Sequence, residues 1–529
     1  MEIFNTLREI AFYAFGIILS LGLFILTCEF ALHPLKKYPG PFIAKFTDGY
    51  GGYFAVKKRL HLATYRDHLS YANRCRTCPV FRQAPNRLIF NTSSALRDIY
   101  LNPGMNKAHI YRHTQFNPQV NIFGTLDRER HRQKRKIYGQ VLSERSLRTF
   151  EPIMIGEIDI FVRQLLITKS KSVNMSPLCE RLTTDIAGQL AFGQPFDTQV
   201  DVTNRIFPRA MISMNGIVNT FLSWPSIAKT WPVLKLLNKK GSLAFTTAIQ
   251  GIIQKRMALP KDAKHDFYSI AAGEVDMSEN GLRRSELWAE AVFFLPAGGT
   301  TLSAALSAAF FYLSRNPTAY SRLATEIRTT FSSNLDIQSG SKLSGCKYLR
   351  AVIDETLRVA PPFVGTFWRE PYSDYTQPLV VDGHVIPHGT MVGVNPYCVM
   401  HNEKYFPEPF KFQPERWLGP EDGTSGSAEE EQSRAAMRAA FAPFALGDTG
   451  CLGKAMAYHE TGLVLAKTLW YFDFEKAPGA AGKLGEGQPG RRDGRDKVDE
   501  YQLFDLAVAD HDGPNLVFIP RGNHLDELN

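Results

Sequence analysis

One loop, Phe444–Gly453, constrains this chain more than any other segment. Its sequence, Phe-Ala-Leu-Gly-Asp-Thr-Gly-Cys-Leu-Gly, places Cys451 among glycines, seven residues after an aromatic side chain. A run with helical spacing follows from Lys454 to about Phe472. Free backbone N–H groups and the positive end of a helix dipole stabilise a thiolate at such a position. The glycines permit positive φ angles and the close approach of a flat ligand: Gly447, Gly450 and Gly453.

Such a cysteine suits the role of an anionic metal ligand, and a haem iron fits that description. The alternative is a buried free cysteine after a loop, which describes most cysteines. No cysteine or histidine pair stands near Cys451 at zinc-ligand spacing, so the segment gives no support to a zinc site. Cys75-Arg-Thr-Cys78 resembles half of a redox or zinc motif, but no second pair matches it. The loop alone leaves the haem ligand and the buried cysteine open.

The composition indicates a large buried core and a reducing, intracellular environment. The chain has 529 residues, of which 44% are hydrophobic, and it can bury a sizeable interior. Its seven cysteines are scattered and odd in number, which favours a reducing compartment over a disulfide framework. The formal net charge of +9 is modest for this length and is spread along the chain, so we expect no nucleic-acid partner.

The N-terminal segment contains a candidate membrane anchor. Ile10–Cys28 carries no charge and is long enough to cross a bilayer as a helix. It is too long for a signal peptide, and no small-residue cleavage site follows. Lys36 and Lys37 come after it, which places the body on the cytosolic side.

We therefore predict three parts along the chain. Residues 1–33 hold a transmembrane anchor at about 10–32. Residues 34–41, rich in proline, form a stiff hinge. Residues 42–529 form one body, which we expect to be mainly α-helical, because helical periodicity dominates from about Leu142 to Leu357. Small β pieces are expected near 80–91 and 379–394. Gly419–Arg434 and Ala477–Asp499 are expected to be solvated surface insertions.

A long helical pattern, Ser285–Arg315, contains Pro296-Ala-Gly-Gly-Thr-Thr301. Paired glycines inside a helix cost about 1 kcal/mol each relative to alanine, and Pro296 removes a backbone hydrogen bond. This predicts a weak point that is kinked or opened for a ligand, with the Thr301 hydroxyl beside it. The alternative is an ordinary buried helix whose threonine bonds back to its own turn.

Three charged residues farther along form a candidate ion cluster. Glu355 and Arg358 stand three apart on an amphipathic helix that stops at a proline pair, so they can form an ion pair. Apolar neighbours imply that this pair is partly buried. Arg416, in Phe412-Gln-Pro-Glu-Arg-Trp417, offers a third charge. A planar guanidinium suits bidentate contact with a carboxylate.

The order of these four motifs resembles the cytochrome P450 family of haem-thiolate monooxygenases, over essentially the whole chain. The resemblance implies the cytochrome P450 fold, mainly α with small β-sheets, over residues 42–529. It implies haem b (iron protoporphyrin IX) with Cys451 as the axial thiolate. Phe444, Gly447 and Gly453 would bind around the cofactor. Thr301 would be the distal alcohol that helps deliver protons to iron-bound dioxygen.

The resemblance also assigns the charged residues. Glu355, Arg358 and Arg416 would form a structural triad on the proximal side. His131, Arg135 and Arg369 match positions that lie against the haem propionates. The other basic residues of Asp127–Lys136, with Lys454, would form the docking surface for an acidic flavoprotein reductase.

Two residues depart from the family pattern. Thr300 stands where the family often has an acid before the distal threonine, so water or another group must relay protons. Thr449 stands where an arginine usually binds a propionate, which shifts that role to Arg135, His131 and Arg369.

The resemblance implies a membrane-anchored, monomeric enzyme of the fungal type that tailors secondary metabolites. NADPH–cytochrome P450 reductase would supply electrons, with cytochrome b5 as a further donor, at the endoplasmic reticulum membrane. It would be a single-pass protein with its catalytic domain in the cytosol. Alternatives are a haem-thiolate isomerase or dehydratase that needs no dioxygen, and a non-catalytic haem-binding membrane protein. The expected pocket lining is apolar and aromatic, which favours a lipophilic substrate: Phe116, Ile122 and Phe123, residues 206–237, Phe293–Ala297 and Phe363–Trp368.

Overall fold

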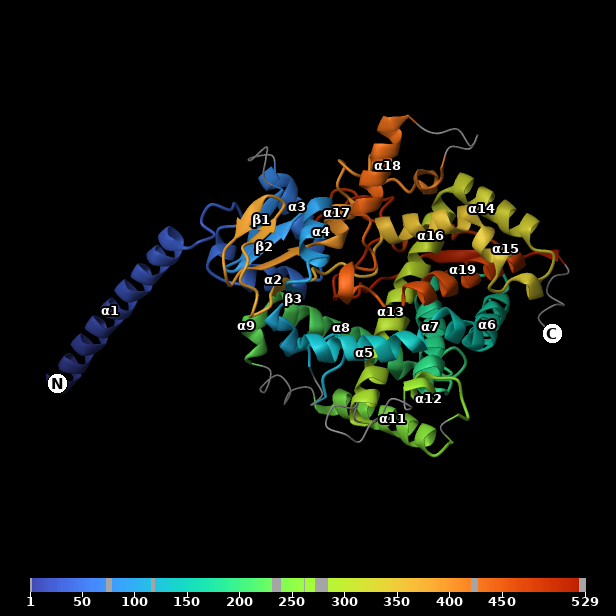
Figure 1. Ribbon diagram of the computed structural model, residues 1–529, viewed down its shortest axis with the longest axis horizontal. Coiled ribbons are helices and arrows are strands. Elements are labelled where there is room, and N and C mark those ends of the chain that lie inside the picture. Colours follow the sequence, from blue (N-terminus) through green and yellow to red (C-terminus); the bar gives the residue numbers. More distant parts are fainter. Residues whose placement is uncertain are drawn as a thin grey trace.

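Helices form most of the body, and the sheet that contains β1 (Val80–Ala84), β2 (Arg87–Phe90) and β3 (Met105–Lys107) lies on the side that carries the N-terminal helix (Figure 1). The computed structural model describes residues 2–72, 79–115, 119–230, 239–260, 262–271, 284–419 and 427–522. The Cys75–Cys78 motif lies outside this part of the chain, as does Phe116.

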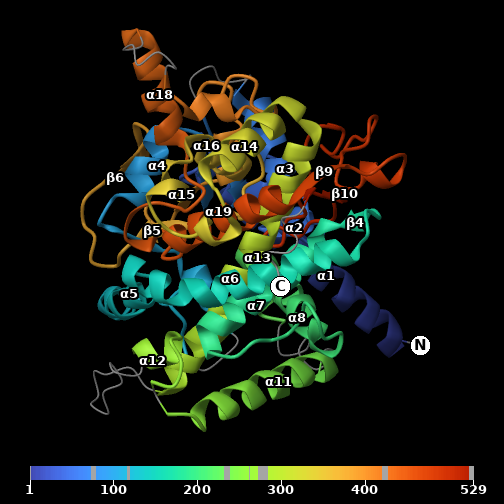
Figure 2. The same ribbon diagram turned by 90° about the vertical axis from the view of Figure 1, so that its right-hand side faces the viewer.

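The helix α13 (Arg284–Arg315) runs through the middle of the body (Figures 1 and 2). It packs along α7 (Met175–Phe192), and its glycine pair lies at the contact with neighbouring helices. A Cβ added to Gly298 would lie 3.5 Å from the Ala187 Cβ, and one on Gly299 would lie 3.4 Å from the Met211 Cε. The helix continues without a break through Pro296–Thr301. The expected kink or opening is therefore absent from the backbone of α13, and a Cβ at either glycine would lie at ordinary contact distance from the neighbouring helices.

The main hydrophobic core joins α13 to long helices before and after it in the chain. These are α6 (Glu144–Ile167), α14 (Pro317–Thr330), α16 (Lys347–Val359) and α19 (Lys454–Tyr471). The helical periodicity predicted between residues 142 and 357 is thus confirmed. The remaining helices surround this core: α2 (Gly49–Val56), α3 (Leu60–Ala72), α4 (Ser93–Tyr100), α5 (Arg128–Val141), α8 (Ile206–Ser223), α9 (Pro225–Ala228), α11 (Lys239–Met257), α12 (Phe267–Ala271), α15 (Ser341–Gly345), α17 (Pro396–Met400) and α18 (Ala428–Ala440).

Small sheets form where the sequence predicted β structure. A five-stranded sheet has the order β1-β2-β8-β5-β3, in which β2 and β8 are parallel and the other neighbours antiparallel. Its strands are β1 (Val80–Ala84), β2 (Arg87–Phe90), β3 (Met105–Lys107), β5 (Arg369–Pro371) and β8 (Met391–Val394). A hairpin joins β6 (Leu379–Val381) to β7 (His384–Ile386). A third sheet, in the order β4-β10-β9, contains β4 (Val173–Asn174), β9 (Phe472–Lys476) and β10 (Asn515–Pro520).

The N-terminal helix α1 (Glu2–Leu32) projects away from the body (Figure 1). Large apolar side chains of α1 are exposed, for example Phe12 at 74% and Phe15 at 65%. Among the described residues, Glu286–Arg315 has the length and hydropathy of a membrane span, but 67% of its apolar window is buried. That segment is the core helix α13. The anchor at about 10–32 stays a prediction.

Of the first predicted insertion, Gly419–Arg434, residues 420–426 lie outside the described part of the chain, and residues 427–434 are mostly exposed, as expected of a surface insertion. Residues 428–434 belong to α18, because Ser427 and Glu430 form a capping box at its start. This helix stands out from the body in both ribbon views (Figures 1 and 2). In the second segment, Glu486 is buried and lies 3.1 Å from the Arg315 guanidinium. An ion pair to the core helix therefore fixes part of a segment whose composition predicts a solvated loop.

Candidate functional site

The loop Phe444–Gly453 folds tightly against α4. The Cys451 N–H donates to the Phe444 carbonyl at 2.8 Å, and the Gly450 N–H donates to the Gly447 carbonyl at 2.9 Å. Gly447 has φ +69°, and a Cβ there would lie 2.0 Å from the Tyr100 carbonyl oxygen, so no other residue fits. Gly450 and Gly453 have φ −62° and −82°. The predicted need for positive φ therefore holds at Gly447 alone.

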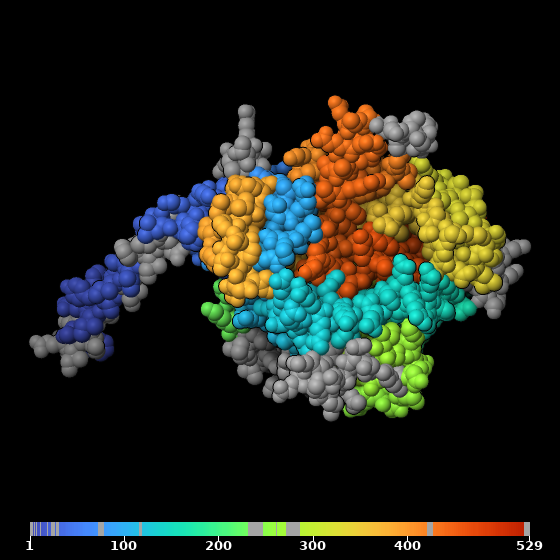
Figure 3. Space-filling model, viewed as in Figure 1, coloured from blue at the N-terminus to red at the C-terminus, as the bar shows by residue number. Residues whose placement is uncertain are grey.

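Residues near 450 lie at the centre of the face shown in Figure 3, between the segment near residue 100 and the α5–α6 region. Cys451 is exposed. Burial raises the pKa of this thiol, and this effect is larger than the opposing ones. The Gly453 N–H and the cations Arg135 and Lys454 lower the pKa. A bound metal ion deprotonates a coordinating thiol outright. The helix α19 begins three residues later, as the sequence predicted.

The structure brings the predicted propionate-binding residues to the same loop. The Arg135 Nη1 on α5 donates to the Gly450 carbonyl at 2.6 Å. The Arg369 Nη2 on β5 donates to the Thr449 hydroxyl at 2.6 Å. Arg369 is 3% exposed, and its other bond goes to the Trp368 carbonyl. Thr449 therefore positions a buried guanidinium where the family usually has a second arginine.

A cationic cluster of Lys107, Lys134, Arg135 and Arg369 surrounds His131. Burial and these four charges lower the pKa of His131 to about 3, so its imidazole is neutral. Lys107 was missed by the sequence interpretation, because a single lysine in a short strand gives no sequence signal. It is 5% exposed, and its ammonium bonds the carbonyls of Ile122 and Phe123 at 2.6 and 2.9 Å.

This cluster fits an anionic ligand. Lys107, Arg135 and Arg369 bond neutral oxygens, and in the described part of the chain the carboxylates bonded to the cluster are Glu286 and Glu290, both held by Lys134. Buried positive charge without a counter-charge is unfavourable. The two carboxylates of a haem supply that charge, next to a cysteine suited to bind its iron. The residues present therefore fit the cofactor.

Replacing Arg369 with leucine is expected to weaken haem retention. The change removes a charge-assisted bond of about 1.5–3 kcal/mol, so haem loss to apomyoglobin should accelerate by about 10- to 100-fold. Arg132→Leu is the control, because this arginine is exposed and pairs with Glu129 at 2.8 Å on the surface of α5. Equal rates of haem loss in the two variants would contradict the role of Arg369.

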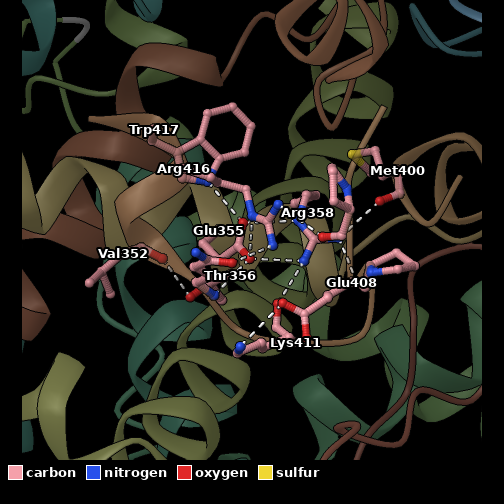
Figure 4. A network of polar contacts seen from close by, with 12 residues as sticks. Val352, Glu355, Thr356, Arg358, Met400, Glu408, Lys411, Arg416 and Trp417 are labelled. Carbon is pink, nitrogen blue, oxygen red and sulfur yellow. Dashed lines mark hydrogen bonds and ion pairs between the residues drawn. The ribbon is translucent and has the colours of Figure 1, made fainter. Parts of the chain in front are cut away.

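The three predicted triad residues meet in the core (Figure 4). The Arg358 Nη2 and Nε donate to the two oxygens of Glu355, both at 2.9 Å, and the Arg416 Nε donates at 3.1 Å. Glu355 and Arg358 are fully buried. Burial alone would raise the pKa of Glu355, but Arg358 and Arg416 outweigh it and lower that pKa.

The structure adds a fourth side chain to this triad. The Trp417 Nε1 donates to Glu355 at 2.9 Å, and the Gln413 N–H donates to the same carboxylate at 2.9 Å. Trp417 directly follows Arg416, so its position beside the motif was a usable sequence signal. Arg358 also bonds the carbonyls of Met400, Pro409 and Lys411 at 3.0, 2.7 and 3.1 Å. The network thus links α16 to the segment that precedes the cysteine loop.

Three threonine hydroxyls donate to backbone carbonyls in the middle of α13. The Thr301 hydroxyl donates to the Ala297 carbonyl at 2.6 Å, and Thr300 donates to the Pro296 carbonyl at 2.6 Å. From α7, the Thr183 hydroxyl donates to the Gly299 carbonyl at 2.7 Å. Such bonds compete with the helix backbone ladder and loosen it locally. Thr301 is half-buried, whereas Thr300 is buried.

The basic residues of α5 divide between the interior and the surface. Lys134 is 1% exposed and lies 2.8 Å from Glu290, and Arg130 lies 2.6 Å from Glu286. Both side chains hold α5 to α13, so neither belongs to the predicted docking surface. Arg132, Lys136 and Lys454 are exposed and stay available to a partner.

Aromatic pairs occupy three of the predicted pocket segments. Phe123 stacks on Phe293 with ring centres 5.7 Å apart, and Phe363 stacks on Phe367 at 4.1 Å. Ile122 is buried and its N–H donates to Glu290 at 3.0 Å. Of residues 206–237, the described part forms α8 and α9.

Comparison with known proteins adds independent evidence. Residues 93–490 match the sequence profile of the family described as Cytochrome P450. Cytochrome P450 monooxygenase poxM of Penicillium oxalicum is 33% identical, over 96% of this chain and 92% of its own length. Cytochrome P450 monooxygenase AKT7 of Alternaria alternata is 32% identical, over 92% and 93%. Cytochrome P450 monooxygenase atnE of Emericella nidulans is 30% identical, over 98% of both chains.

These matches extend over far more than the cysteine loop, and they agree with the mainly helical fold with small sheets. The family binds haem through a cysteine thiolate, which favours the interpretation of Cys451 as the haem ligand. This chain belongs to the cytochrome P450 family and is a haem-thiolate monooxygenase.

Proposed function

We propose that this monooxygenase oxidises a lipophilic intermediate of fungal secondary metabolism, by hydroxylation, epoxidation, desaturation or ring closure. The observation that carries the proposal is the pair of aromatic stacks, Phe123 on Phe293 and Phe363 on Phe367. They come from segments that the family uses around its substrate, and their rings are flat and apolar. Such a lining favours an aromatic or polycyclic substrate.

Each site residue has a proposed task. Cys451 is the axial ligand, held by its N–H bond to Phe444 in the loop that Gly447 makes possible. His131, Arg135 and Arg369 lie against the propionates, and Gly453 directs its N–H at the sulfur. Glu355, Arg358 and Arg416 hold the proximal side. When bound, the haem activates dioxygen for transfer of one oxygen atom, and the thiolate favours O–O cleavage.

The hydroxyl of Thr301 holds a proton on the distal side. Its bond to the Ala297 carbonyl fixes the oxygen at one rotamer, from which it can donate after that bond breaks. Electrons come from NADPH through a cytochrome P450 reductase, with cytochrome b5 as a further donor, docked on the exposed cations of α5 and α19. We propose that the protein acts as a monomer.

The N-terminal part completes the proposal. Residues 1–33 would anchor the chain through α1, 34–41 would be the hinge, and 42–529 the catalytic domain. The exposed apolar side chains of α1 support this division, because water is an unfavourable environment for them. The lysines after the helix favour a single-pass protein of the endoplasmic reticulum with its body in the cytosol.

Reconstitution with reductase tests the proposed reaction. Purified full-length enzyme, reductase and NADPH are incubated with lipophilic extracts of a fungal culture, and products are sought by mass spectrometry. We expect NADPH- and dioxygen-dependent products that differ by one oxygen atom, two hydrogens or both. Conversion that proceeds equally without NADPH and dioxygen would favour an isomerase or dehydratase and overturn the proposal.

A further inference from the structure

A narrow recess opens beside α13. It lies next to Thr300, a residue at which this chain departs from the family pattern. It is lined by residues of α7, α8, α13 and the segment 506–511, among them Glu180, Asn215, Thr300, Ser303, Asp510 and His511. Its free volume is about 330 Å³, and the space open to the centres of water molecules is about 10 Å³. That is room for roughly one water molecule. The recess therefore suits water and excludes an organic substrate.

Thr300 is the polar residue at the α13 wall of this recess. It is 7% exposed, its hydroxyl donates to the Pro296 carbonyl at 2.6 Å, and it accepts from the Asn215 Nδ2 at 3.1 Å. The bond from α8 fixes the hydroxyl oxygen between two helices. Thr300 thus lines the recess, and Thr301, the residue assigned to the distal side, follows it in the chain.

Glu180 stands on the α7 wall with a free carboxylate. Within the described residues, its oxygens make no hydrogen bond and no ion pair. Burial raises the pKa of Glu180 to about 7, Asp510 and Asp512 add to the increase, and Arg181 on the same helix opposes it. Asp510 itself pairs with Lys58 at 3.0 Å, and Asp512 accepts from Asn174 at 2.7 Å. Glu180 is therefore a proton donor near neutral pH.

The imidazole of His511, on the facing wall, supports a recess that is polar and holds water. His511 lines the recess, and its Nε2 is buried with no hydrogen-bond partner in the described part of the chain. Burial lowers the pKa of His511, so the ring is neutral near pH 7. A buried nitrogen without a protein partner is commonly satisfied by water. Water in the recess would lie among His511, Glu180 and Thr300.

We propose that Glu180 supplies protons through this recess to Thr300 and Thr301, in place of the acid that the family often has at position 300. The Glu180 carboxyl gives its proton to a recess water, and that water gives one of its own to the Thr300 oxygen. Thr300 then turns its hydroxyl away from the Pro296 carbonyl and releases the proton, and the Thr301 hydroxyl accepts it after its own bond to the Ala297 carbonyl breaks. The Glu180 carboxylate is reprotonated from solvent. No electrons move in these steps. The proposal rests on the proposed role of Thr301.

Glu180→Gln is the decisive variant, because glutamine keeps the shape and cannot release a proton. In the full-length holoenzyme with reductase, NADPH consumption should fall by about 10²-fold. Its solvent deuterium isotope effect should rise. In the wild type the rate should decrease as pH rises through about 7, because the carboxylic acid is the donor form. The variant should lose this dependence, and Glu180→Asp should restore part of the rate and a pH dependence.

A second measurement detects the protonation of the Glu180 carboxyl directly. Infrared difference spectra between about pH 5 and about pH 8 should show an acid that titrates in the wild type and is absent in Glu180→Gln. The control is Glu157→Gln, which alters another buried carboxyl whose pKa is raised to about 6, on α6 and away from the recess. It should leave the rate and its pH profile unchanged.

The outcomes separate this proposal from the proposed function. Glu180→Gln must keep its haem and its reduced, carbon-monoxide-bound spectrum. A rate and pH profile like those of the wild type, an equal loss in Glu157→Gln, or no titrating Glu180 in the infrared would each overturn the proton route. Failure of the wild type to turn over any lipophilic extract would instead contradict the proposed function.

Discussion

Cys451→Ser is expected to abolish the red-shifted absorption band of the reduced, carbon-monoxide-bound protein. A serine hydroxyl has a far higher pKa than a thiol, so at neutral pH it does not supply an anionic ligand. It also lacks the sulfur electrons that favour O–O cleavage. NADPH-dependent turnover should fall below detection. The Gly447 turn and the N–H bond to Phe444 do not depend on the sulfur, so the loop should still fold.

Cys398→Ser is the matched control for this experiment. Cys398 is also a free cysteine and is fully buried, but it lies on α17. Serine there should lower stability, because burial of a hydroxyl is unfavourable, and it should leave the spectral band intact. Loss of the band in Cys398→Ser, or its survival in Cys451→Ser, would refute the ligand assignment.

Glu355→Gln is expected to destabilise the protein by about 3–5 kcal/mol. It removes the carboxylate that accepts from Arg358 at 2.9 Å and from Arg416 at 3.1 Å. The two guanidinium groups would then lie in the core without an anion, and an amide N–H₂ would face them. The midpoint of urea unfolding, followed by circular dichroism, measures the loss. Haem content should fall with it, because the network supports the segment before the cysteine loop.

Two further variants separate the contribution of burial to stability from the contribution of charge. Glu144→Gln breaks an ion pair of 3.8 Å whose side chains are 84% and 74% exposed, and it should change stability little. Trp417→Phe removes one bond to the Glu355 carboxylate and keeps both arginines, so it should cost about 1.5–3 kcal/mol. If the three variants unfold at the same urea concentration, the network does not contribute through its buried charge.

The pH dependence of this network has a definite sign. Because the folded state lowers the pKa of Glu355, the ion pairs are intact at neutral pH. Their contribution is present above the ordinary carboxyl pKa and is lost as pH falls through the folded value. Glu180 behaves in the opposite way, since its pKa is raised to about 7. The same residue type therefore serves a structural role in one place and a proton-donating role in the other.

Local patterns predicted the elements that depend on local forces. Helix α19 begins at Lys454 as expected, because a glycine-rich loop ends where helical spacing starts. The pairing of Glu355 with Arg358 follows from a separation of three residues on one helix. The composition of Gly419–Arg434 predicts a solvated insertion and gives no helix, although the Ser427–Glu430 capping box of α18 is readable in the sequence. That error came from weighing composition above a local motif.

Long-range contacts account for the rest. The glycine pair in α13 looked like an opening, yet its partners Ala187 and Met211 come from helices a hundred residues earlier. Lys107 gave no signal, because its neighbours Arg135 and Arg369 join it only when β3, α5 and β5 meet. The sequence pattern predicts Lys134 to be a surface charge, but in the structure it pairs with Glu290 of α13.

The amino-acid sequence alone identifies the cysteine loop, the order of the motifs and the family, because each motif is a pattern of neighbouring residues and the order of the motifs can be followed along the chain. Only the tertiary structure decided which charges are buried and what each one faces. The Arg369–Thr449 contact and the Glu180–Thr300 recess join segments 80 and 120 residues apart in the chain. Burial and electrostatic interaction depend on such distances in space, and sequence spacing does not fix them.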